Sequence, residues 1–341
     1  MVKIEVSLGD ALDRLSILDI KTKKIVDAEK LEHVVATKAQ LDRDLSAYTD
    51  PYGYNILRYI NEKLYDAETI PHSTTSTLQD HKKIKFLNTM RVNAKRYIDS
   101  KDNSSTIEQK SYTKKIGLFI GHHGYGDVIL LNGAIRYASL QVDELYVFCK
   151  EQYLVNLMLM FSDSQTIKFL PCRDSMALEI PDTLGHTFTH EFISGVYLNN
   201  PPRPGYNITR DFYKDMSIPI DVMYSFFHVP EENQLVPPEQ PYIFMQTKSS
   251  QGTVSFVDWD INEILTIDPN INQYEENHKF YDIAQKYIDQ PIAWYVNLIK
   301  GAKEIHVVDS CFACMAWVLD LQDVKYYDRD TLNYSTIFQK V

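Results

Sequence analysis

Residues 115–127 read KIGLFIGHHGYGD, and this stretch determines the architecture to be expected of the chain. Its first part, residues 115–121, is a short apolar run that ends in glycine, as is typical of a buried β-strand. The turn that follows is rich in glycine and ends at Asp127, and residues 128–139 then repeat apolar side chains at helical spacing. A strand that turns through glycines into a helix is the first half of a βαβ unit, so the stretch predicts a parallel sheet.

The alternation of strand and helix continues towards the end of the chain. Further strands are expected at residues 145–149, 167–170, 242–246, 263–267 and 305–308, and further helices at residues 151–160, 210–216, 278–287, 292–299 and 313–319. The proline-rich VPPEQP at residues 236–241 indicates a hinge between two series of such elements. The chain is therefore predicted to be of the α/β class, with two Rossmann-like lobes over residues 114–237 and 238–341.

Residues 1–105 have a different pattern, in which apolar side chains recur on one face of each of four helices. These helices are expected near residues 8–25, 31–45, 56–67 and 84–98, with a break at Asp50–Gly53. They predict an all-α helical bundle domain, joined to the rest of the chain by a polar linker over residues 100–113. Its charged faces are expected to be solvated, and the alternative is that they contact a partner or a second copy of the chain.

Composition narrows the classes of function. The 341 residues carry a formal net charge of −11, which argues against nucleic-acid binding because such proteins need a basic face. The sequence has no signal-peptide pattern at its start, and its most apolar stretch, residues 153–161, is too short to span a membrane. A cytoplasmic protein without a membrane span is therefore expected. Cys311 and Cys314 form a C-x-x-C, but no second pair accompanies it, so we interpret both thiols as core residues.

The glycine-rich turn at residues 121–127 is the first candidate site. It lies where ligands bind in open α/β sheets, at the carboxyl end of a strand and before the N-terminus of a helix. Its spacing differs from G-x-G-x-x-G, and no acidic residue ends the next strand, which disfavours a nucleotide-dependent oxidoreductase. The alternative is an ordinary glycine-rich turn without a ligand.

Two further polar stretches follow strand ends in the C-terminal part. Asp309 and Ser310 stand between a strand and a helix, where a hydroxyl and free N–H groups form an anion site, or where either side chain merely caps the helix. Residues 246–252 follow another strand and include Lys248. Such a loop can enclose a diphosphate, and the alternative is an ordinary exposed loop.

Residues 117–170 resemble the N-terminal lobe of GT-B glycosyltransferases of the heptosyltransferase-like kind. The similarity lies in GDVIL, GAIRY, LYVFCKEQY and TIKFLP. Residues 292–320 resemble the C-terminal lobe of the same fold, in which a helix leads to IHVVDS and then to FACMAWVLDL. Heptosyltransferases have a histidine after this D-S turn, whereas this chain has Cys314 and Met315, which favours a donor other than a heptose nucleotide. The sequence is more similar to divergent members from phages, large viruses and bacteria.

Residues 4–112 resemble a separate small helical family of unknown function. The matching pieces are IEVSLGDALDRLSILDIKTKKI, NEKLYD and IEQKSY. This resemblance implies an architecture for the N-terminal part of the chain and no chemistry.

The resemblance to GT-B glycosyltransferases implies an enzyme that moves a hexosyl, pentosyl or heptosyl group from a nucleotide-sugar donor to a glycan or other hydroxyl acceptor. The reaction is expected to be inverting and metal-independent, with no metal ion and no cofactor besides the nucleotide-sugar substrate. Asp127 is the first candidate for the catalytic base, and His122 or His123 is the second. The donor-binding candidates are Gly124, Gly126, Gln246, Lys248, Ser249, Asp309, Ser310, Cys311 and Phe312.

The alternative function is a catalytically inactive glycosyltransferase-like module that binds a nucleotide or a glycan. Such a module would act through its helical domain, by contact with a partner or with further copies of the chain through residues 1–105. Turnover of a sugar nucleotide distinguishes the two functions, because a binding module shows none.

Overall fold

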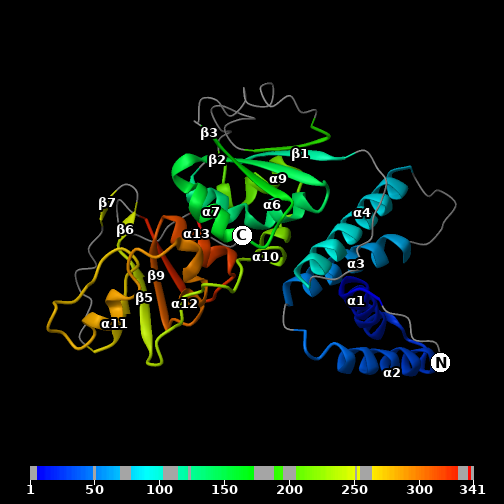
Figure 1. Ribbon diagram of the computed structural model, residues 1–341, viewed down its shortest axis with the longest axis horizontal. Helices are drawn as coiled ribbons and strands as arrows, with labels where there is room; N and C mark the ends of the chain where they lie inside the picture. Colours follow the sequence, from blue (N-terminus) through cyan, green and yellow to red (C-terminus); the bar gives the residue numbers. More distant parts are fainter. Residues whose placement is uncertain are drawn as a thin grey trace. The chain divides into compact units, whose positions relative to one another are not determined.

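The computed structural model describes residues 6–48, 51–69, 78–102, 114–121, 124–172, 188–194, 205–249, 252–253, 263–328 and 337–338. The chain divides into two compact units (Figure 1). The helical unit comprises Met1–Lys115 and Tyr137–Asp143, and the sheet unit comprises Ile116–Arg136 and Glu144–Val341. The domain boundaries expected from the sequence stay a prediction, and residues 103–113 of the expected linker lie outside the described residues.

Four long helices make up most of the helical unit, and each corresponds to one predicted apolar stripe. They are α1 (Leu8–Lys24), α2 (Ala28–Asp44), α3 (Pro51–Thr69) and α4 (Leu78–Lys101). Ser7 caps α1, since its hydroxyl accepts a hydrogen bond from the Asp10 N–H at 3.2 Å. The break expected at Asp50–Gly53 is wrong from Pro51 onwards. Proline is tolerated there because the first residue of a helix needs no N–H partner.

The core of the helical unit combines apolar packing with one buried polar network. Asp13 of α1 accepts hydrogen bonds from Asn61 Nδ2 of α3 at 2.9 Å and from Arg91 Nε of α4 at 2.8 Å. This network ties the three helices together in one register. By contrast, α2 has no buried residue and packs against α1. The buried apolar residues around the network are Leu12, Leu57, Ile60, Met90 and Ala94.

The first sheet of the sheet unit has four parallel strands in the order β3-β2-β1-β4. The strands are β1 (Ile116–Ile120), β2 (Glu144–Lys150), β3 (Ile167–Cys172) and β4 (His190–Ile193), and the helical elements among them are α5 (Tyr125–Leu130), α6 (Asn132–Ser139), η1 (Glu151–Tyr153) and α7 (Leu154–Met160). β1 is an inner strand, and Leu118 and Ile120 form a buried cluster with Phe148 of β2. Strands covered on both faces consist of nearly continuous apolar residues, which explains why β1 was recognisable in the sequence.

The second sheet has the parallel order β10-β9-β5-β8. Its strands are β5 (Tyr242–Gln246), β8 (Leu265–Ile267), β9 (Glu304–Val308) and β10 (Val324–Tyr327), beside a short antiparallel pair, β6 (Lys248–Ser249) and β7 (Gly252–Thr253). The helical elements that follow β4 along the chain are α9 (Ile208–Asp215), α10 (Val222–Ser225), α11 (Tyr281–Gln285), η4 (Ile292–Tyr295), α12 (Val296–Lys300) and α13 (Cys311–Val318). β5 is buried along its whole length, as expected for an inner strand.

These two sheets confirm the predicted mixed α/β class with parallel sheets. Several details differ from the prediction. The edge strands β4 and β10, the short pair β6 and β7, and the helix α10 were not expected. The helix expected over residues 128–139 begins earlier, at Tyr125, and is interrupted at Leu131, so it forms two helices.

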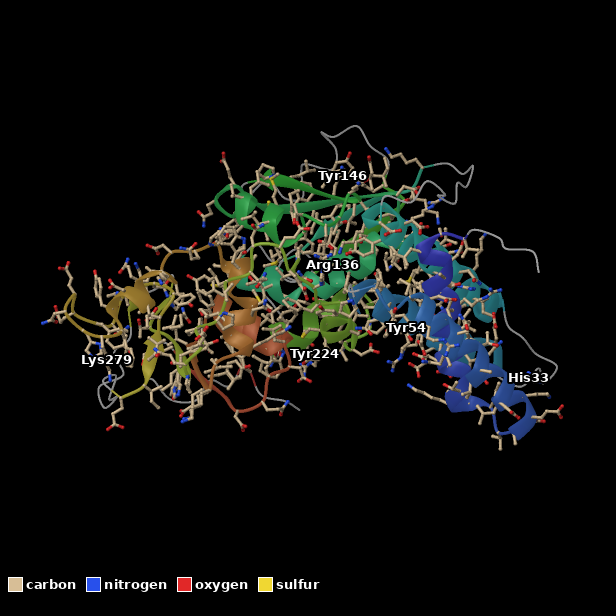
Figure 2. All side chains as sticks on the ribbon, turned by 60° about the horizontal axis from the view of Figure 1, so that its bottom comes forward. His33, Tyr54, Arg136, Tyr146, Tyr224 and Lys279 are labelled. Atoms are coloured by element: carbon tan, nitrogen blue, oxygen red, sulfur yellow. The ribbon has the colours of Figure 1, made fainter. Side chains whose placement is uncertain are left out.

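One buried ion pair joins α6 to the turn after α7. The Arg136 guanidinium, labelled in Figure 2, donates to both carboxylate oxygens of Asp163 at 2.9 Å. It also lies 4.8 Å from the centre of the Phe161 ring and donates to the Met160 carbonyl at 3.0 Å. A buried ion pair offsets its desolvation only when its remaining donors are satisfied, as they are here. The pair therefore holds α6 and the turn after α7 together.

Candidate functional site

The carboxyl ends of strands from both sheets border one cavity of about 820 Å³ in the sheet unit. The volume lies within the range of about 300–1,000 Å³ that is usual for small-molecule and cofactor sites. His122 and His123 lie outside the described residues, so their position relative to the cavity is open. Ten other candidate residues line it, namely Gly124, Gly126, Asp127, Gln246, Lys248, Ser249, Asp309, Ser310, Cys311 and Phe312.

Asp127 lines the cavity from the first turn of α5. Gly124 is the N-cap of this helix, and its N–H donates to Asp127 Oδ2 at 3.1 Å. A carboxylate at the third helical position that accepts from the N-cap N–H is one half of a capping box. Asp127 thus supports the helix start, although as the third helical residue and not as the cap itself. The carboxylate remains partly exposed, and its role as a base stays a prediction.

Ser310 lines the cavity as the N-cap of α13. Its hydroxyl accepts from the Phe312 N–H at 3.2 Å and donates to Gln246 Oε1 at 2.6 Å. The Gln246 amide in turn donates to the Lys248 carbonyl, so the end of β5 is joined to the start of α13. Ser310 therefore caps α13, which is one of the two roles that its position in the sequence indicated. The other N–H groups of the first turn have no partner within the helix, as in any α-helix, and are suited to an anion.

The first turns of α5 and α13 pack directly against each other at Gly126. A Cβ atom placed on Gly126 would lie 3.0 Å from Cys314 Sγ and 3.4 Å from the Cα atom of Cys311. Only glycine allows this approach without displacing the thiol. The start of α5 follows a strand of the first sheet, and the start of α13 follows a strand of the second sheet. The close packing at Gly126 brings both helix starts to the same cavity.

The two thiols at this contact are poor nucleophiles. Burial raises the pKa of Cys311 to about 12 and raises the pKa of Cys314 well above the ordinary thiol value. Both side chains are therefore protonated at neutral pH, whereas thiol reactivity requires the thiolate. This fits their interpretation as packing residues, here in the wall of the site.

Asp268 organises the part of the cavity wall that follows β5 and β8. The side chain is 2% exposed and accepts from the Thr247 N–H at 3.1 Å, the Asn270 N–H at 2.9 Å and Gln273 Nε2 at 3.0 Å. The Thr247 hydroxyl also donates to it. Burial raises the pKa of Asp268 despite these hydrogen bonds. Because Lys248 and Asn270 both line the cavity, Asp268 holds two turns of its wall in place.

The charges around the cavity restrict how it could hold an anion. Among the described lining residues Lys248 is the one cation, and Asp127, Asp289 and Asp309 supply three carboxylates. Side-chain charge alone therefore disfavours a phosphate. Backbone N–H groups at a helix start bind phosphate without a net basic surface, so the start of α13 is the part of the cavity best suited to it.

Several lining residues were not singled out from the sequence. The Tyr125 and Tyr153 rings lie 5.3 Å apart on the side of the first sheet, and Asn156 Oδ1 accepts from the Ile292 N–H at 3.2 Å. Asn270 follows β8 as Ser310 follows β9, so the rule that polar residues after strand ends form sites would have found it. Tyr125 and Tyr153 also follow strand ends, β1 and β2, but tyrosine is so often a packing residue that its type carried no signal. Other lining residues that were not singled out from the sequence are Gln152, Asp289, Gln290 and Tyr295.

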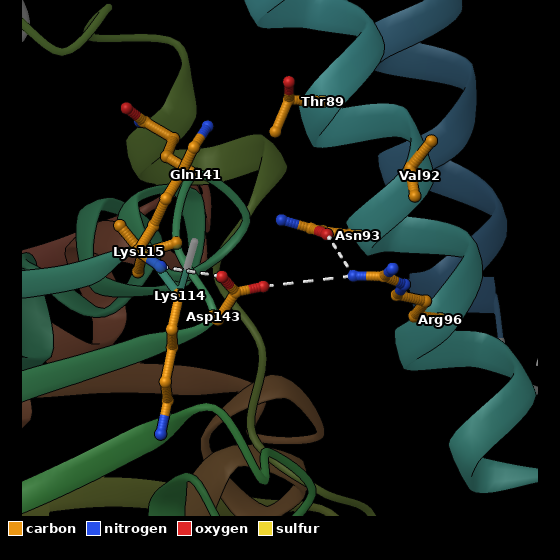
Figure 3. A pocket seen from close by; sticks show the side chains of 9 residues that line it. Thr89, Val92, Asn93, Arg96, Lys114, Lys115, Gln141 and Asp143 are labelled. Atoms are coloured by element: carbon orange, nitrogen blue, oxygen red, sulfur yellow. Dashed lines mark hydrogen bonds and ion pairs between the residues drawn. The ribbon is translucent and has the colours of Figure 1, made fainter. Parts of the chain in front are cut away.

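A second hollow, of about 230 Å³, lies in the helical unit beside α4 (Figure 3). Asp143 lies at its centre, where it accepts from the Lys115 N–H at 2.8 Å and lies 4.0 Å from Arg96 Nη1. None of the candidate residues lines this hollow. Its polar groups are largely satisfied by one another, so it is the weaker candidate.

The described residues do not form an evident metal site. Among them, no group of three or more His, Cys, Asp or Glu side chains is placed to hold a metal ion. We therefore assign no residue of the described chain to a metal.

Comparisons with known proteins give limited similarity. No protein-family model matches the chain, and no curated protein matches it. One similar solved structure is the bacterial iron-containing dodecameric glycosyltransferase TibC from enterotoxigenic E. coli H10407, with 14% identity and a TM-score of 0.42 over 64% of this chain and 60% of that chain. Another is the dodecameric iron-containing heptosyltransferase TibC in complex with ADP-D-β-D-heptose, with 13% identity and a TM-score of 0.41 over 67% of this chain and 63% of that chain. At TM-scores below 0.5, these likenesses establish neither the fold nor the function of this chain.

The comparisons require one correction. The expectation of no metal ion and no cofactor is contradicted, because both TibC structures are of an iron-containing enzyme. Independence from metals is therefore not carried forward. No described helix is long and apolar enough to cross a membrane.

Proposed function

We propose that this protein is a glycosyltransferase of GT-B architecture, with an N-terminal helical domain and two Rossmann-like lobes. It would move a sugar from a nucleotide-sugar donor to a hydroxyl acceptor such as a glycan. The observation that carries the proposal is the single cavity in which Asp127, from the first sheet, and the Ser310-capped start of α13, from the second sheet, occur together. A transferase of this kind needs both a base for the acceptor and a site for the leaving diphosphate.

The donor diphosphate is assigned to the start of α13. The N–H groups of the first turn that have no partner and the Lys248 ammonium would stabilise the charge that develops on the leaving phosphate. The Ser310 hydroxyl would join them by turning its one proton from Gln246 Oε1 to the phosphate. Gln246 and Asp268 would act indirectly, since Gln246 holds Ser310 and Asp268 holds the turn before Lys248. Asn270, Asp289 and Gln290 also line the cavity and are available to the nucleoside.

Asp127 is assigned as the base, with His122 or His123 as the second choice. It would accept the proton of the acceptor hydroxyl while that oxygen forms a bond to the anomeric carbon of the donor sugar. The bond from this carbon to the diphosphate oxygen breaks at the same time, and the nucleoside diphosphate leaves with the electron pair. Attack from the face opposite the leaving group inverts the configuration at this carbon.

An inactive binding module is the second candidate, and a specific observation favours it. Asp127 and Ser310 both serve as helix-start groups, so their presence is explained without catalysis. In that case the cavity would hold a nucleotide or a glycan without turnover. The helical domain, through residues 1–105, would then contact a partner or further copies of the chain.

Release of nucleoside diphosphate from a panel of ADP-, UDP-, GDP- and dTDP-sugars tests the proposal. We expect slow hydrolysis of one donor by water, accelerated by the correct acceptor. The assay is run with and without added Fe²⁺, Mg²⁺ and a chelator, so that any metal requirement is read from the same measurement. Calorimetric binding without turnover under all conditions would support the binding module, and the absence of both binding and turnover would refute the assignment of the cavity.

A further inference from the structure

Tyr125, the first residue of α5, has a buried hydroxyl that finds no hydrogen-bond partner among the described residues. The residue is 6% exposed, and its phenolic oxygen forms no hydrogen bond to any residue that the structure describes. Other buried tyrosines of the sheet unit are satisfied: the hydroxyls of Tyr213 and Tyr242 donate to backbone carbonyls at 2.8 Å and 2.6 Å. A buried polar group that lacks a partner is costly and rare, so it calls for an explanation.

The position of Tyr125 supplies that explanation. The residue lines the cavity, and its ring lies 5.3 Å from that of Tyr153. The next residue, Gly126, packs on the backbone of Cys311. Tyr125 therefore belongs to the first turn of α5, which packs against the helix start to which the donor diphosphate is assigned.

The chemistry of the phenol specifies what it can bind. Burial, with a smaller effect of Cys311, raises the pKa of Tyr125, so the hydroxyl keeps its proton and donates a hydrogen bond. It cannot serve as a base at neutral pH. A ligand group that pairs with the Tyr125 hydroxyl must therefore be a hydrogen-bond acceptor. Phosphate oxygens are strong acceptors.

We propose that the Tyr125 hydroxyl donates a hydrogen bond to a diphosphate oxygen of the bound donor, and that Tyr125 is thus a binding residue contributed by the first sheet to the leaving group. This inference rests on the proposed function. Because the hydroxyl oxygen is sealed from solvent in the ligand-free chain, the first turns of α5 and α13 must separate slightly, or the ring must rotate, before the contact forms. The Tyr125 hydroxyl then gains a hydrogen-bond partner only when the ligand is bound.

The test compares Tyr125→Phe with the matched control Tyr213→Phe in the full-length protein. Calorimetry measures the Kd of ADP, UDP and GDP, and of the corresponding nucleosides, while thermal unfolding is followed without ligand. For Tyr125→Phe we expect an unchanged or higher Tm and about tenfold or greater loss of affinity for the nucleoside diphosphate that binds the wild type, as for a lost hydrogen bond to a charged group. Affinity for the nucleoside should not change.

The control variant should show the opposite pattern. Tyr213→Phe removes the donor to the Leu130 carbonyl, so its Tm should fall while its affinity stays at the wild-type value. Unchanged diphosphate affinity in Tyr125→Phe would overturn the inference and leave the proposed function intact. A fall in Tm as large as that of the control would also overturn it, because the hydroxyl would then have a protein partner. If the wild type binds none of the three diphosphates, the proposed function fails and the inference fails with it.

Discussion

Asp127 is the side chain on which the proposed chemistry depends most directly. An asparagine oxygen can accept the Gly124 N–H that Asp127 Oδ2 accepts now, so Asp127→Asn should preserve the start of α5. The amide cannot take up a proton, and general-base catalysis is worth about 10²–10⁴ in rate. We therefore expect wild-type Tm and donor affinity with a loss of transfer of about that size, measured as product formation at saturating donor.

Transfer near the wild-type rate in Asp127→Asn would contradict the assignment. The same assay on His122→Gln and His123→Gln would then identify the base. If Asp127→Asn also loses stability, the pH–rate profile of the wild type separates a carboxylate from an imidazole, because their ordinary pKa values differ by about 2.6 units.

Asp268 makes the stability of the sheet unit depend on pH. Burial raises its pKa in the folded chain, so the unfolded chain releases this proton at lower pH than the folded chain does. Asp268 therefore stabilises the folded state most when it is protonated, and this contribution falls as pH rises from the ordinary carboxyl pKa, about 3.9, through the raised value. Urea denaturation of the wild type and Asp268→Asn over this window should show the variant gaining stability relative to the wild type as pH rises.

A constant offset between the two proteins is expected in addition, since an amide cannot accept from all the donors around Asp268. The pH dependence of the difference is the informative measurement. A difference that stays constant from about pH 3.5 to pH 7 would mean that Asp268 titrates with its ordinary pKa.

Much of the candidate site could be predicted from the sequence, because ligands of open α/β sheets bind at the carboxyl ends of the strands. Asp127, Lys248 and Ser310 each follow a buried strand, and the carboxyl ends of parallel strands lie at one edge of their sheet. Tyr125 lies in the same turn as Asp127, so the rule covers its position, but only the structure reveals that its hydroxyl has no partner among the described residues. The rule also does not reveal that Asp268 is buried and joins two segments, since the sequence shows an aspartate after a strand and not the donors Thr247, Asn270 and Gln273 around it.

The contact between α5 and α13 can be tested through Gly126. Gly126→Ala would place a methyl group 3.0 Å from Cys314 Sγ, so the helix starts must move apart by a few tenths of an ångström. Overpacking of this kind costs about 1–3 kcal/mol. We expect a lower free energy of unfolding together with weaker binding of nucleoside diphosphate, measured by urea denaturation and calorimetry.

Two further variants isolate the cause. Cys314→Ala removes the sulfur that the new methyl group meets, so the double variant should regain part of the lost affinity. Gly133→Ala, where a Cβ atom would lie 2.4 Å from the Val222 carbonyl, should reduce stability without changing affinity, because Gly133 does not line the cavity. Equal loss of affinity in Gly133→Ala and Gly126→Ala would attribute the effect to general destabilisation.

The inner strands were predictable, and so were the edge strands β3 and β8, whereas the edge strands β4 and β10 were not. β1 and β5 are covered on both sides, so their apolar runs are unmistakable in the sequence. β4 and β10 pair on one side only, and HEFI and VKYY mix charged with aromatic residues. Tertiary pairing, and not local pattern, places these two strands in their sheets.

The proposed separation of functions between the two units can be tested by deletion. Every described residue that lines the large cavity belongs to the sheet unit, so a chain of residues 114–341 should bind nucleoside diphosphate with wild-type affinity in calorimetry. The deletion removes α1 to α4 and exposes Leu140 and Val142, which are 7% and 2% exposed in the full chain. We therefore expect the shortened protein to be less soluble.

A companion deletion that carries Leu140→Gln and Val142→Thr controls for that exposure. It should recover solubility at unchanged affinity. A shortened protein that unfolds cooperatively but binds the diphosphate more than tenfold less tightly would show that the helical unit contributes to the site.

The discontinuous make-up of the helical unit has a consequence for protein synthesis. Its four helices end at Lys101, but Tyr137–Asp143 belong to the same unit, and Asn93 Nδ2 of α4 donates to the Leu140 carbonyl at 2.7 Å. The ribosome adds about 5–20 residues per second, so α4 waits roughly 2–8 seconds for these partners after its own synthesis. In the meantime β1, α5 and most of α6 have emerged. The bundle therefore reaches its final form only as the first sheet begins to fold, and the nascent chain offers an incompletely covered α4 to chaperones during that interval.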